Sequence, residues 1–524
     1  MNERPDRGTA PVRSRAARGG LRGLLRGSML YTLGNFLPRV GAFLMLPVYT
    51  ANLDAADFGV FSLMLSLSGL LAIVYRLGLD GALMRFHFDV RERQRPSLYL
   101  TLAAATLLAG VVMTLLLGLA AGPLFERLFA GVAFWPIGVL TLLLTFLMAF
   151  QYVPASFFRA TEQPGRFVAL TAGIFVLGVA GTLFFLFGLH LGAAGALLGQ
   201  VMGALGIILV TVAVLVRLGP TRLDADLLRR SLGFGLPLVP HALSAWVLNL
   251  SDRFLISLVI GLSAVQAQTA IGIYSFGYQL GQVVSLVALS FNAAWVPYFY
   301  ANGDKPGGPA VLREMTTLAT GALAVLAVGM AAIAPEATTL LASGRWGSAA
   351  DEAATVVPLV ALASLAYGVY FMVVSAVFLV RRTRLLPLLT LGAGLANVAA
   401  NLLLIPRFGI LGAAVATLLG YAVLTVATTV YARRGYPLQL DGTRLALLFA
   451  GAVAAMGVAR LLILPALGLA VNGLVHLGVA LAFAAGALLV VRGPVTRLRQ
   501  LMGGSGGASQ VGGDGTIAPA KENP

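Results

Sequence analysis

Gly59-Val60-Phe61-Ser62 returns later in this chain as Gly272-Ile273-Tyr274-Ser275, and this repeat decides the fold. Two further stretches also recur in the same order: Leu33–Val40 (LGNFLPRV) as Leu232–Val239 (LGFGLPLV), and Leu191–Ala196 (LGAAGA) as Leu411–Ala416 (LGAAVA). The offsets are similar, at 213, 199 and 220 residues. Three matches in order indicate a duplication, and duplicated membrane halves commonly frame a cavity that opens alternately to each side.

The composition places the chain in a membrane. Its 524 residues have a mean hydropathy of +0.90, with 59% hydrophobic and only 11% charged residues. A soluble domain of this length carries more charge on its surface, so the bilayer is the solvent. A net charge of +16 suggests at first a protein that binds nucleic acid. The charges lie between apolar runs, however, and not on one soluble face, which argues against that function. The absence of cysteine excludes a disulfide scaffold and a thiolate metal site.

Fourteen apolar segments predict an all-α polytopic membrane protein. Each is near the roughly 20 residues that cross the hydrocarbon as a helix, and a helix is required because its backbone groups bond within the segment. The segments cover about 28–51, 58–84, 98–121, 132–158, 167–188, 191–216, 232–260, 269–298, 316–341, 354–380, 385–405, 409–431, 444–465 and 468–491.

The positive charges predict the orientation. If the loops alternate between the two sides, the set that includes both termini carries 29 Lys and Arg, and the other set carries four. Cytoplasmic loops are enriched in these residues, so both termini are predicted to be cytoplasmic, and the number of spans is even.

Charged residues inside the spans are expensive and therefore candidates for function. In the first span Asn35 and Arg39 share one helical face, which suits an anionic ligand in a wet cavity. The alternative is an arginine that snorkels or pairs with a carboxylate. In the second span Arg76 and Asp80 are spaced i,i+4. They either neutralise each other, or Arg76 contacts the substrate and Asp80 binds the coupling ion.

The second half offers further polar positions. His241 and Asp252 in the seventh span are candidates for proton or ion coupling, with a packing histidine and an interfacial anchor as the alternatives. Tyr278, Gln279 and Gln282 in the eighth span suit sugar hydroxyls, and they equally suit helix–helix hydrogen bonds. For Asn397 and Asn401, spaced i,i+4 in the eleventh span, packing is the favoured interpretation.

Missing motifs favour a transporter over an enzyme. The chain has no Gly-rich phosphate loop followed by Lys-Ser/Thr, and no sizeable external loop with a nucleophile motif or paired carboxylates. With four scattered histidines and no cysteine, a metal site is not expected. We therefore expect no cofactor and no catalytic residue.

Two regions resemble a known family. The segments Leu53–Leu63 (LDAADFGVFSL) and Leu77–Phe86 (LGLDGALMRF) are similar to the signature of polysaccharide-biosynthesis membrane proteins, the oligosaccharide-lipid flippases of the multidrug/oligosaccharidyl-lipid/polysaccharide exporter superfamily. Ser251–Phe254 (SDRF), Ile271–Ser275 and Phe408–Ala414 (FGILGAA) resemble the second half of that family. Arg39 matches a recurrent family arginine in the first span, whereas Arg76 and Asp80 depart from the usual pattern.

The resemblance implies two six-helix lobes facing each other as a V, plus two C-terminal helices. The corresponding parts of this chain are a basic N-tail (1–27), an N-lobe (28–216), a linker (217–231), a C-lobe (232–431), two extra helices (444–491) and a disordered cytoplasmic tail (492–524).

The function that the resemblance implies is flipping of undecaprenyl-diphosphate-linked oligosaccharides across the bacterial inner membrane, for lipopolysaccharide O-antigen or exopolysaccharide. Membrane lipids, a polysaccharide polymerase and a chain-length regulator are the expected partners, and nucleic acid is not. The alternatives are a peptidoglycan-precursor (lipid II) flippase, an ion-coupled multidrug exporter and, from a different class, a membrane glycan polymerase or ligase.

Overall fold

The computed structural model describes residues 20–503 except 121, 130, 343 and 464–467, and this part of the chain is helical without a strand. The helices are α1 (Gly20–Leu44), α2 (Leu46–Asn52), α3 (Ala55–Arg76), α4 (Leu79–Asp89), α5 (Arg95–Ala120), α6 (Gly122–Leu128), α7 (Val139–Ala149), α8 (Tyr152–Ala160), α9 (Pro164–Leu183), α10 (Gly192–Leu218), α11 (Ala225–Gly235), α12 (Val239–Val259), α13 (Ala264–Gly281), α14 (Val283–Asn302), α15 (Gly308–Ala332), α16 (Ala334–Leu341), α17 (Ser348–Leu379), α18 (Leu386–Arg433), α19 (Gly442–Leu461) and α20 (Gly468–Gly503).

Thirteen helical stretches of the described residues are long and apolar enough to cross a membrane. One of them, Thr383–Arg433, has 51 residues. At about 1.5 Å per residue it is more than twice the roughly 30 Å of hydrocarbon that a span must cross. It therefore holds two spans, and counting them separately gives the fourteen predicted from the sequence.

Gly409 divides α18 into two legs. Its φ of 57° and ψ of −135° are non-helical and lie where glycine is favoured. A Cβ on Gly420 would lie 2.9 Å from the Cβ of Asn397, and one on Gly412 would lie 2.4 Å from the Leu404 carbonyl oxygen. In both contacts the two residues lie at nearly equal distances along the chain before and after residue 409. The two legs therefore fold back on each other as a hairpin.

The same hairpin occurs in the first half, which supports the duplication. Helix α9 packs on α10, with Gly199 against Thr182 and Gly203 against the Ile174 carbonyl. The repeated stretches Leu191–Ala196 and Leu411–Ala416 stand at equivalent places, where the second member of each hairpin begins.

The repeat-related glycines Gly59 and Gly272 meet where α3 packs on α13. A Cβ on Gly59 would be 1.9 Å from the Gln268 carbonyl oxygen, and one on Gly272 would be 1.8 Å from that of Ala55. Only glycine permits this approach of two backbones, which is how small residues bring membrane helices together. The sequence repeat thus places its own two copies in direct contact.

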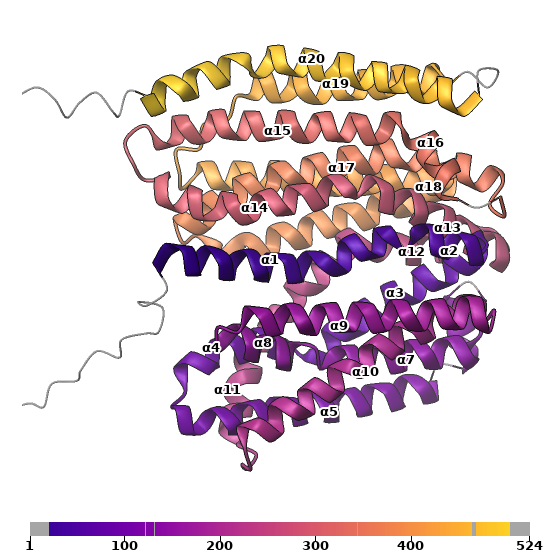
Figure 1. Cartoon of the computed structure of the whole chain (residues 1–524), viewed down its shortest axis with the longest axis vertical. Coiled ribbons are helices and arrows are strands. Elements are labelled where there is room, and N and C mark those ends of the chain that lie inside the picture. Colours follow the sequence, from indigo (N-terminus) through magenta and orange to yellow (C-terminus); the bar gives the residue numbers. More distant parts are fainter. Residues whose placement is uncertain (1–19, 121, 130, 343, 464–467, 504–524) are drawn as a thin grey trace, which may run out of the picture. The chain divides into compact units, whose positions relative to one another are not determined.

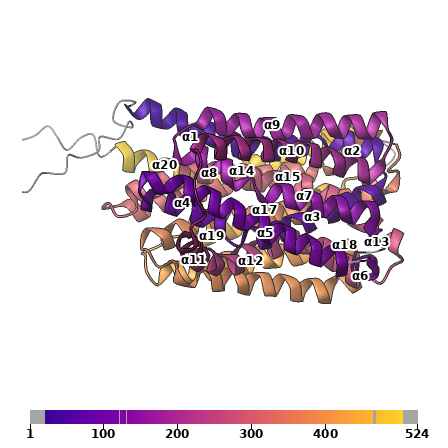
Figure 2. The ribbon, with the colours of Figure 1, turned by 90° about the horizontal axis from the view of Figure 1, so that it is seen from below.

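The helices form two compact units. Of the described residues, unit 1 comprises those within 20–282, 334–360 and 386–423, and unit 2 those within 283–333, 361–385 and 424–503. Within each unit the long helices run side by side along a common direction (Figures 1 and 2). The core of unit 1 includes Phe58, Leu63 and Phe276, all 0% exposed. The division into an N-lobe and a C-lobe remains a prediction.

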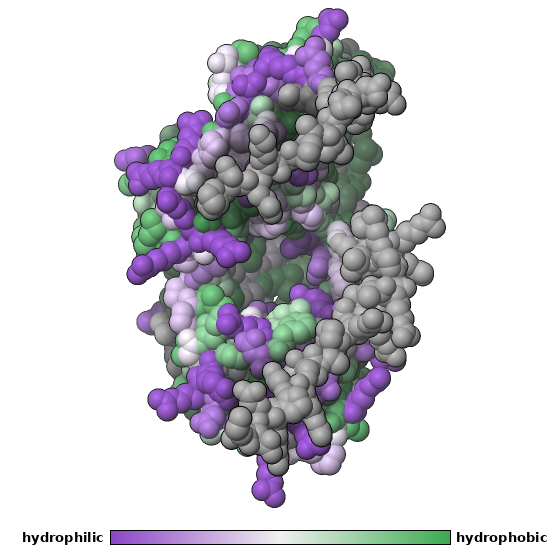
Figure 3. Space-filling view, turned by 90° about the vertical axis from the view of Figure 1, so that its left-hand side faces the viewer, coloured by the Kyte–Doolittle hydropathy of each residue, from purple (hydrophilic) through white to green (hydrophobic). Residues whose placement is uncertain are grey.

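Hydrophilic residues are frequent where the helices end. In unit 1 the turn between α4 and α5, from Arg91 to Gln94, is exposed. The space-filling view onto the helix ends shows many hydrophilic residues on this face (Figure 3). This pattern is expected of helices whose middles lie in hydrocarbon and whose ends reach the headgroups.

Candidate functional site

Asp252 on α12 is the centre of a buried polar cluster in unit 1. It is 0% exposed. Tyr274 Oη donates to its Oδ2 at 2.5 Å, Thr417 Oγ1 donates to Oδ2 at 2.7 Å, and Asn401 Nδ2 donates to Oδ1 at 2.8 Å. The donors come from α13 and from both legs of α18, so four helical segments meet at one carboxylate.

The chemistry of this cluster suits exchange of a proton or a monovalent cation. Burying a carboxylate costs several kcal/mol, and hydrogen bonds from neutral donors offset that cost without cancelling the charge. The Oδ1 atom of Asn401 is buried without a hydrogen-bond partner, and Asn397 Oδ1 is 3.2 Å from Asn401 Nδ2. Carboxylate, amide and hydroxyl oxygens are ligands for hard cations. The described residues contain no cluster of three acidic, His or Cys side chains that would favour a multivalent metal.

Arg253 is a second charge in the same cluster. It is 5% exposed, and its Nε donates to Ser275 Oγ at 3.1 Å. Its guanidinium carbon lies 4.8 Å from the centroid of the Tyr278 ring, a cation–π contact that is strengthened by burial. Tyr278, predicted to contact sugar, is 2% exposed and packs under this arginine.

Arg76 and Asp80 lie on different helices. Leu77 and Gly78 have φ values of 52° and 70°, so α3 ends at Arg76 and α4 begins at Leu79. The predicted placement of both residues on one helix is therefore wrong, because a left-handed C-cap interrupts the helix. Their mutual neutralisation and their role toward substrate or ion stay predictions. The half-buried Arg76 donates from Nη2 to the Met148 carbonyl at 2.8 Å, and Asp80 is exposed.

Arg39 and Asn35 are exposed on α1. Gly34 and Gly41 of the same helix contact Phe167 and Phe175 of α9. At about 100° per residue, Arg39 lies some 140–160° around the helix from these glycines. The guanidinium is therefore turned away from α9, and its role as a ligand contact stays a prediction.

The remaining predicted residues are not gathered at the Asp252 cluster. Gln279 is half-buried on α13, and the half-buried Gln282 stands at the break between α13 and α14. His241 is exposed, and its Nδ1 lies 3.2 Å from Thr390 Oγ1. A proton-coupling role for His241 stays a prediction.

A tryptophan closes the predicted external end of unit 1. Trp346 lies in the predicted external loop and is 4% exposed. Its Nε1 donates to the Leu53 carbonyl at 3.0 Å, and its ring centroid is 5.7 Å from that of Phe58 and 5.0 Å from that of Phe276. A segment of the second half thus binds α3 beside the Gly59–Gly272 contact.

The family model of polysaccharide biosynthesis proteins matches residues 24–302. This chain belongs to that family. The matched residues contain α12 with Asp252 and α13 with Tyr274. A curated relative in Haemophilus influenzae, "Lsg locus putative protein 1", is 39% identical over 69 residues, which is 13% of this chain and 16% of that protein.

Solved structures share the fold. A lipid II flippase, MurJ, in an inward closed conformation has a TM-score of 0.69 at 11% identity, covering 88% of this chain and 99% of that one. An inward-facing multidrug resistance transporter of the MATE family has a TM-score of 0.54 at 15% identity, covering 80% and 95%. The chain is thus a polytopic α-helical protein whose fold is shared with these two solved transporters.

Three members of the cluster were missed from the sequence. Arg253 entered the sequence analysis only as part of the stretch Ser251–Phe254, and Tyr274 only as part of the repeat. A single hydroxyl such as that of Thr417 gives no signal in the sequence, because hydroxyls are common in membrane helices. The i,i+4 pair Asn397 and Asn401 was the available signal. It was assigned to packing, and the structure adds the hydrogen bond from Asn401 to Asp252.

Proposed function

We propose that this protein flips undecaprenyl-diphosphate-linked oligosaccharide repeat units across the bacterial inner membrane for synthesis of a surface polysaccharide. The observation that carries the proposal is the family match over residues 24–302, on a fold shared with a solved lipid II flippase. Lipopolysaccharide O-antigen and exopolysaccharide are the pathways that this substrate serves, and a polymerase and a chain-length regulator are the proposed partners.

Arg39 is the proposed anchor for the diphosphate. Its side chain is exposed on the side of α1 away from α9. A guanidinium offers a planar set of donors that fits phosphate oxygens, and its attraction is stronger in a low-dielectric vestibule than in water. Asn35 on the same face and Gln279 and Gln282 of α13 are proposed contacts for the glycan.

Asp252 is the proposed coupling site. Its hydrogen-bond donors lie on separate helical segments, so a proton or sodium ion that replaced one hydrogen bond would change how these helices hold together. Such a change gives an ion different affinities for two conformations, which is what coupling requires.

A lipid II flippase is the second candidate. The observation in its favour is the fold match to MurJ over 88% of this chain. At 11% identity that match establishes the fold without the substrate. The two candidates differ in the glycan, so rescue of surface polysaccharide or of peptidoglycan synthesis separates them.

The experiment compares Arg39→Ala and Arg39→Lys in a strain that lacks the native gene, scored for surface polysaccharide at matched expression. We expect Arg39→Ala to lose nearly all polysaccharide and Arg39→Lys to keep part of it, because the charge remains. Full activity of a well-expressed Arg39→Ala protein would remove the anchor assignment. Rescue of peptidoglycan synthesis by the unaltered chain, without surface polysaccharide, would favour the second candidate.

Alternating access is tested separately at the Trp346 closure. The chain has no cysteine, so Phe58→Cys with Trp346→Cys gives a clean pair for a short thiol-reactive cross-linker such as a bis-maleimide, which adds to both thiols without an oxidant. We expect bridging to stop transport, because the predicted external end must open, and each single cysteine variant to be unaffected by the reagent. Transport at full rate by the bridged protein would reject the opening of this end.

A further inference from the structure

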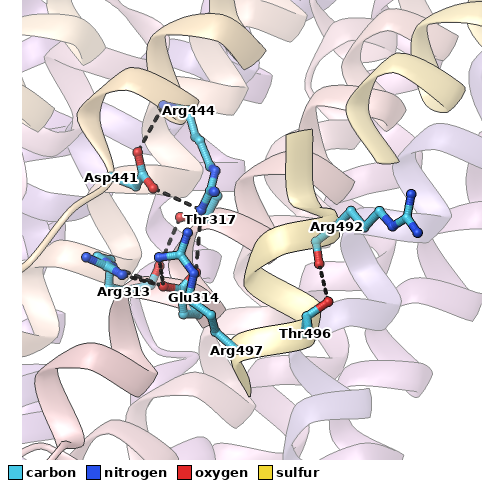
Figure 4. A network of polar contacts seen from close by, with 8 residues as sticks. All are labelled: Arg313, Glu314, Thr317, Asp441, Arg444, Arg492, Thr496 and Arg497. Atoms are coloured by element: carbon cyan, nitrogen blue, oxygen red, sulfur yellow. Dashed lines mark hydrogen bonds and ion pairs between the residues drawn. The ribbon is translucent and has the colours of Figure 1, made fainter. Parts of the chain in front are cut away.

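Glu314 of α15 gathers three arginines from three helices of unit 2 (Figure 4). Its Oε1 accepts from Arg313 Nη2 at 2.6 Å and from Arg497 Nη1 of α20 at 3.1 Å. Arg444 Nη1 of α19 lies 3.8 Å from its Oε2. One carboxylate therefore holds the ends of α15, α19 and α20 together.

The local structure fixes these side chains. Asp441 caps α19 by accepting from the Arg444 backbone N–H at 3.2 Å, and its Oδ2 is 3.0 Å from Arg444 Nη1. Gly493 on α20 leaves the space that the Arg444 guanidinium fills, since a Cβ there would be 2.9 Å from Arg444 Nη2. Arginines held in this way have already lost much of the rotamer entropy that binding would otherwise cost.

The cluster presents a surplus of positive charge to its surroundings. The side chain of Glu314 is 1% exposed, whereas those of Arg313, Arg444 and Arg497 are 29%, 22% and 43% exposed. Three guanidinium groups against the carboxylates of Glu314 and Asp441 leave a formal charge of +1. Glu314 lies beneath the cations, whereas Asp441 is 20% exposed, about as much as Arg444. Each guanidinium has five N–H donors for a few contacts within the cluster.

We propose that this cluster binds the phosphodiester of an anionic phospholipid. Arg313 and Arg444 lie within two turns of the starts of α15 and α19, the depth at which a headgroup meets a spanning helix. A phosphodiester carries one negative charge, which matches the surplus, and guanidinium groups bind phosphate through paired hydrogen bonds. Basic pockets between membrane helices on the cytoplasmic side, where the sequence predicts these ends to lie, are known to hold such lipids.

Arg492 provides a matched control. It lies on α20, about one and a half turns before Arg497, is exposed, and points away from Glu314 (Figure 4). Replacing it removes the same charge from the same helix and leaves the cluster intact. A diffuse attraction of basic residues to an anionic surface would not distinguish the two positions.

The experiment measures lipid binding to the purified full chain by native mass spectrometry, with phosphatidylglycerol against phosphatidylcholine, and by thermal shift. We expect a preference for phosphatidylglycerol that Arg497→Gln reduces roughly fivefold and Arg444→Gln with Arg497→Gln about 30-fold. Arg492→Gln, the single-charge match for Arg497→Gln, should leave the preference largely in place. Equal loss in Arg497→Gln and Arg492→Gln, or no loss in the double variant, would overturn the site. If the double variant does not fold, the unaltered protein still tests the site. Equal binding of phosphatidylglycerol and phosphatidylcholine to it would by itself overturn the proposal. Equal stabilisation by millimolar inorganic phosphate would assign the cluster to free anions and reject the lipid.

Discussion

Asp252 in unit 1 and Glu314 in unit 2 are both buried carboxylates, at 0% and 1% exposure, but their partners are opposite in kind. Asp252 accepts from a phenol, a hydroxyl and an amide, whereas Glu314 accepts from guanidinium groups. Neutral donors do not cancel the charge of Asp252, and the neighbouring Arg253 donates to Ser275 and lies over the Tyr278 ring. The carboxylate can therefore still take up a proton or a cation. Guanidinium groups neutralise the carboxylate permanently, because arginine does not lose its proton in proteins. The comparison teaches that the nature of the donors separates a carboxylate suited to exchange from one suited to fixing structure.

The largest expected effect is on activity at the first carboxylate. Asp252→Asn keeps the size of the side chain and removes its charge, so we expect the rate of flipping in proteoliposomes to fall roughly 100-fold, within the range of coupling free energies. Its dependence on the proton or sodium gradient should disappear. The control is Asp226→Asn at an exposed aspartate of α11, which should retain that dependence. An Asp252→Asn protein with full, gradient-dependent flipping would end the proposed role of Asp252.

The second effect is on stability at the other carboxylate. Glu314→Gln leaves three arginines without their shared anion, and we expect a loss of about 2 kcal/mol in unfolding free energy, less than for a fully buried pair because the arginines still reach water. Thermal unfolding in detergent measures this change, and flipping by the folded protein should stay near normal. Glu92→Gln, in the exposed pair with Arg95, should cost under about 0.5 kcal/mol. A Glu314→Gln protein that is stable but inactive would break the contrast between the two sites.

Two threonines sharpen the comparison at smaller scale. Thr417 and Thr317 are each 1% exposed, but the first donates to Asp252 at 2.7 Å and the second to the Arg313 backbone carbonyl at 3.0 Å. Thr417→Val removes a hydrogen bond that stabilises the charged carboxylate, worth roughly 1.5–3 kcal/mol, so a coupling ion, which has to displace that bond, should bind about tenfold more tightly. Thr317→Val should leave ion affinity unchanged. Ion titration of flipping measures both, and similar behaviour of the two variants would count against an ion at Asp252.

The smallest effect concerns pH and a group outside both clusters. Burial, aided by the charge of Arg95, lowers the pKa of His87 to about 4. The unfolded histidine has a pKa near 6.5, so between these values the unfolded chain binds a proton that the folded chain does not. Thermal stability should therefore decline as pH falls from about 6.5 towards 4. His87→Gln should flatten this decline, and an unchanged pH profile would show that His87 is not its source.

Much of the architecture followed from the sequence. Hydrocarbon thickness sets the length of each apolar run, so the spans were found before any contact was known, and the hairpin at Gly409 joins two of them as predicted. The repeat was found as well, although its most direct consequence, the contact of Gly59 with Gly272, was not. Asp252 and the pair Asn397 and Asn401 were each identified from the sequence. The hydrogen bond that joins Asn401 to Asp252 was not.

The sequence by itself determined which segments enter the bilayer, their number, their duplication and the family, because these depend on local composition and on order along the chain. Only the tertiary structure decided the partners. Asp252 bonds across 149 and 165 residues to Asn401 and Thr417, and Glu314 pairs with Arg497 across 183. Such contacts have no local periodicity, since they depend on how helices pack. For the same reason only the structure revealed that one carboxylate has neutral donors and the other has cations.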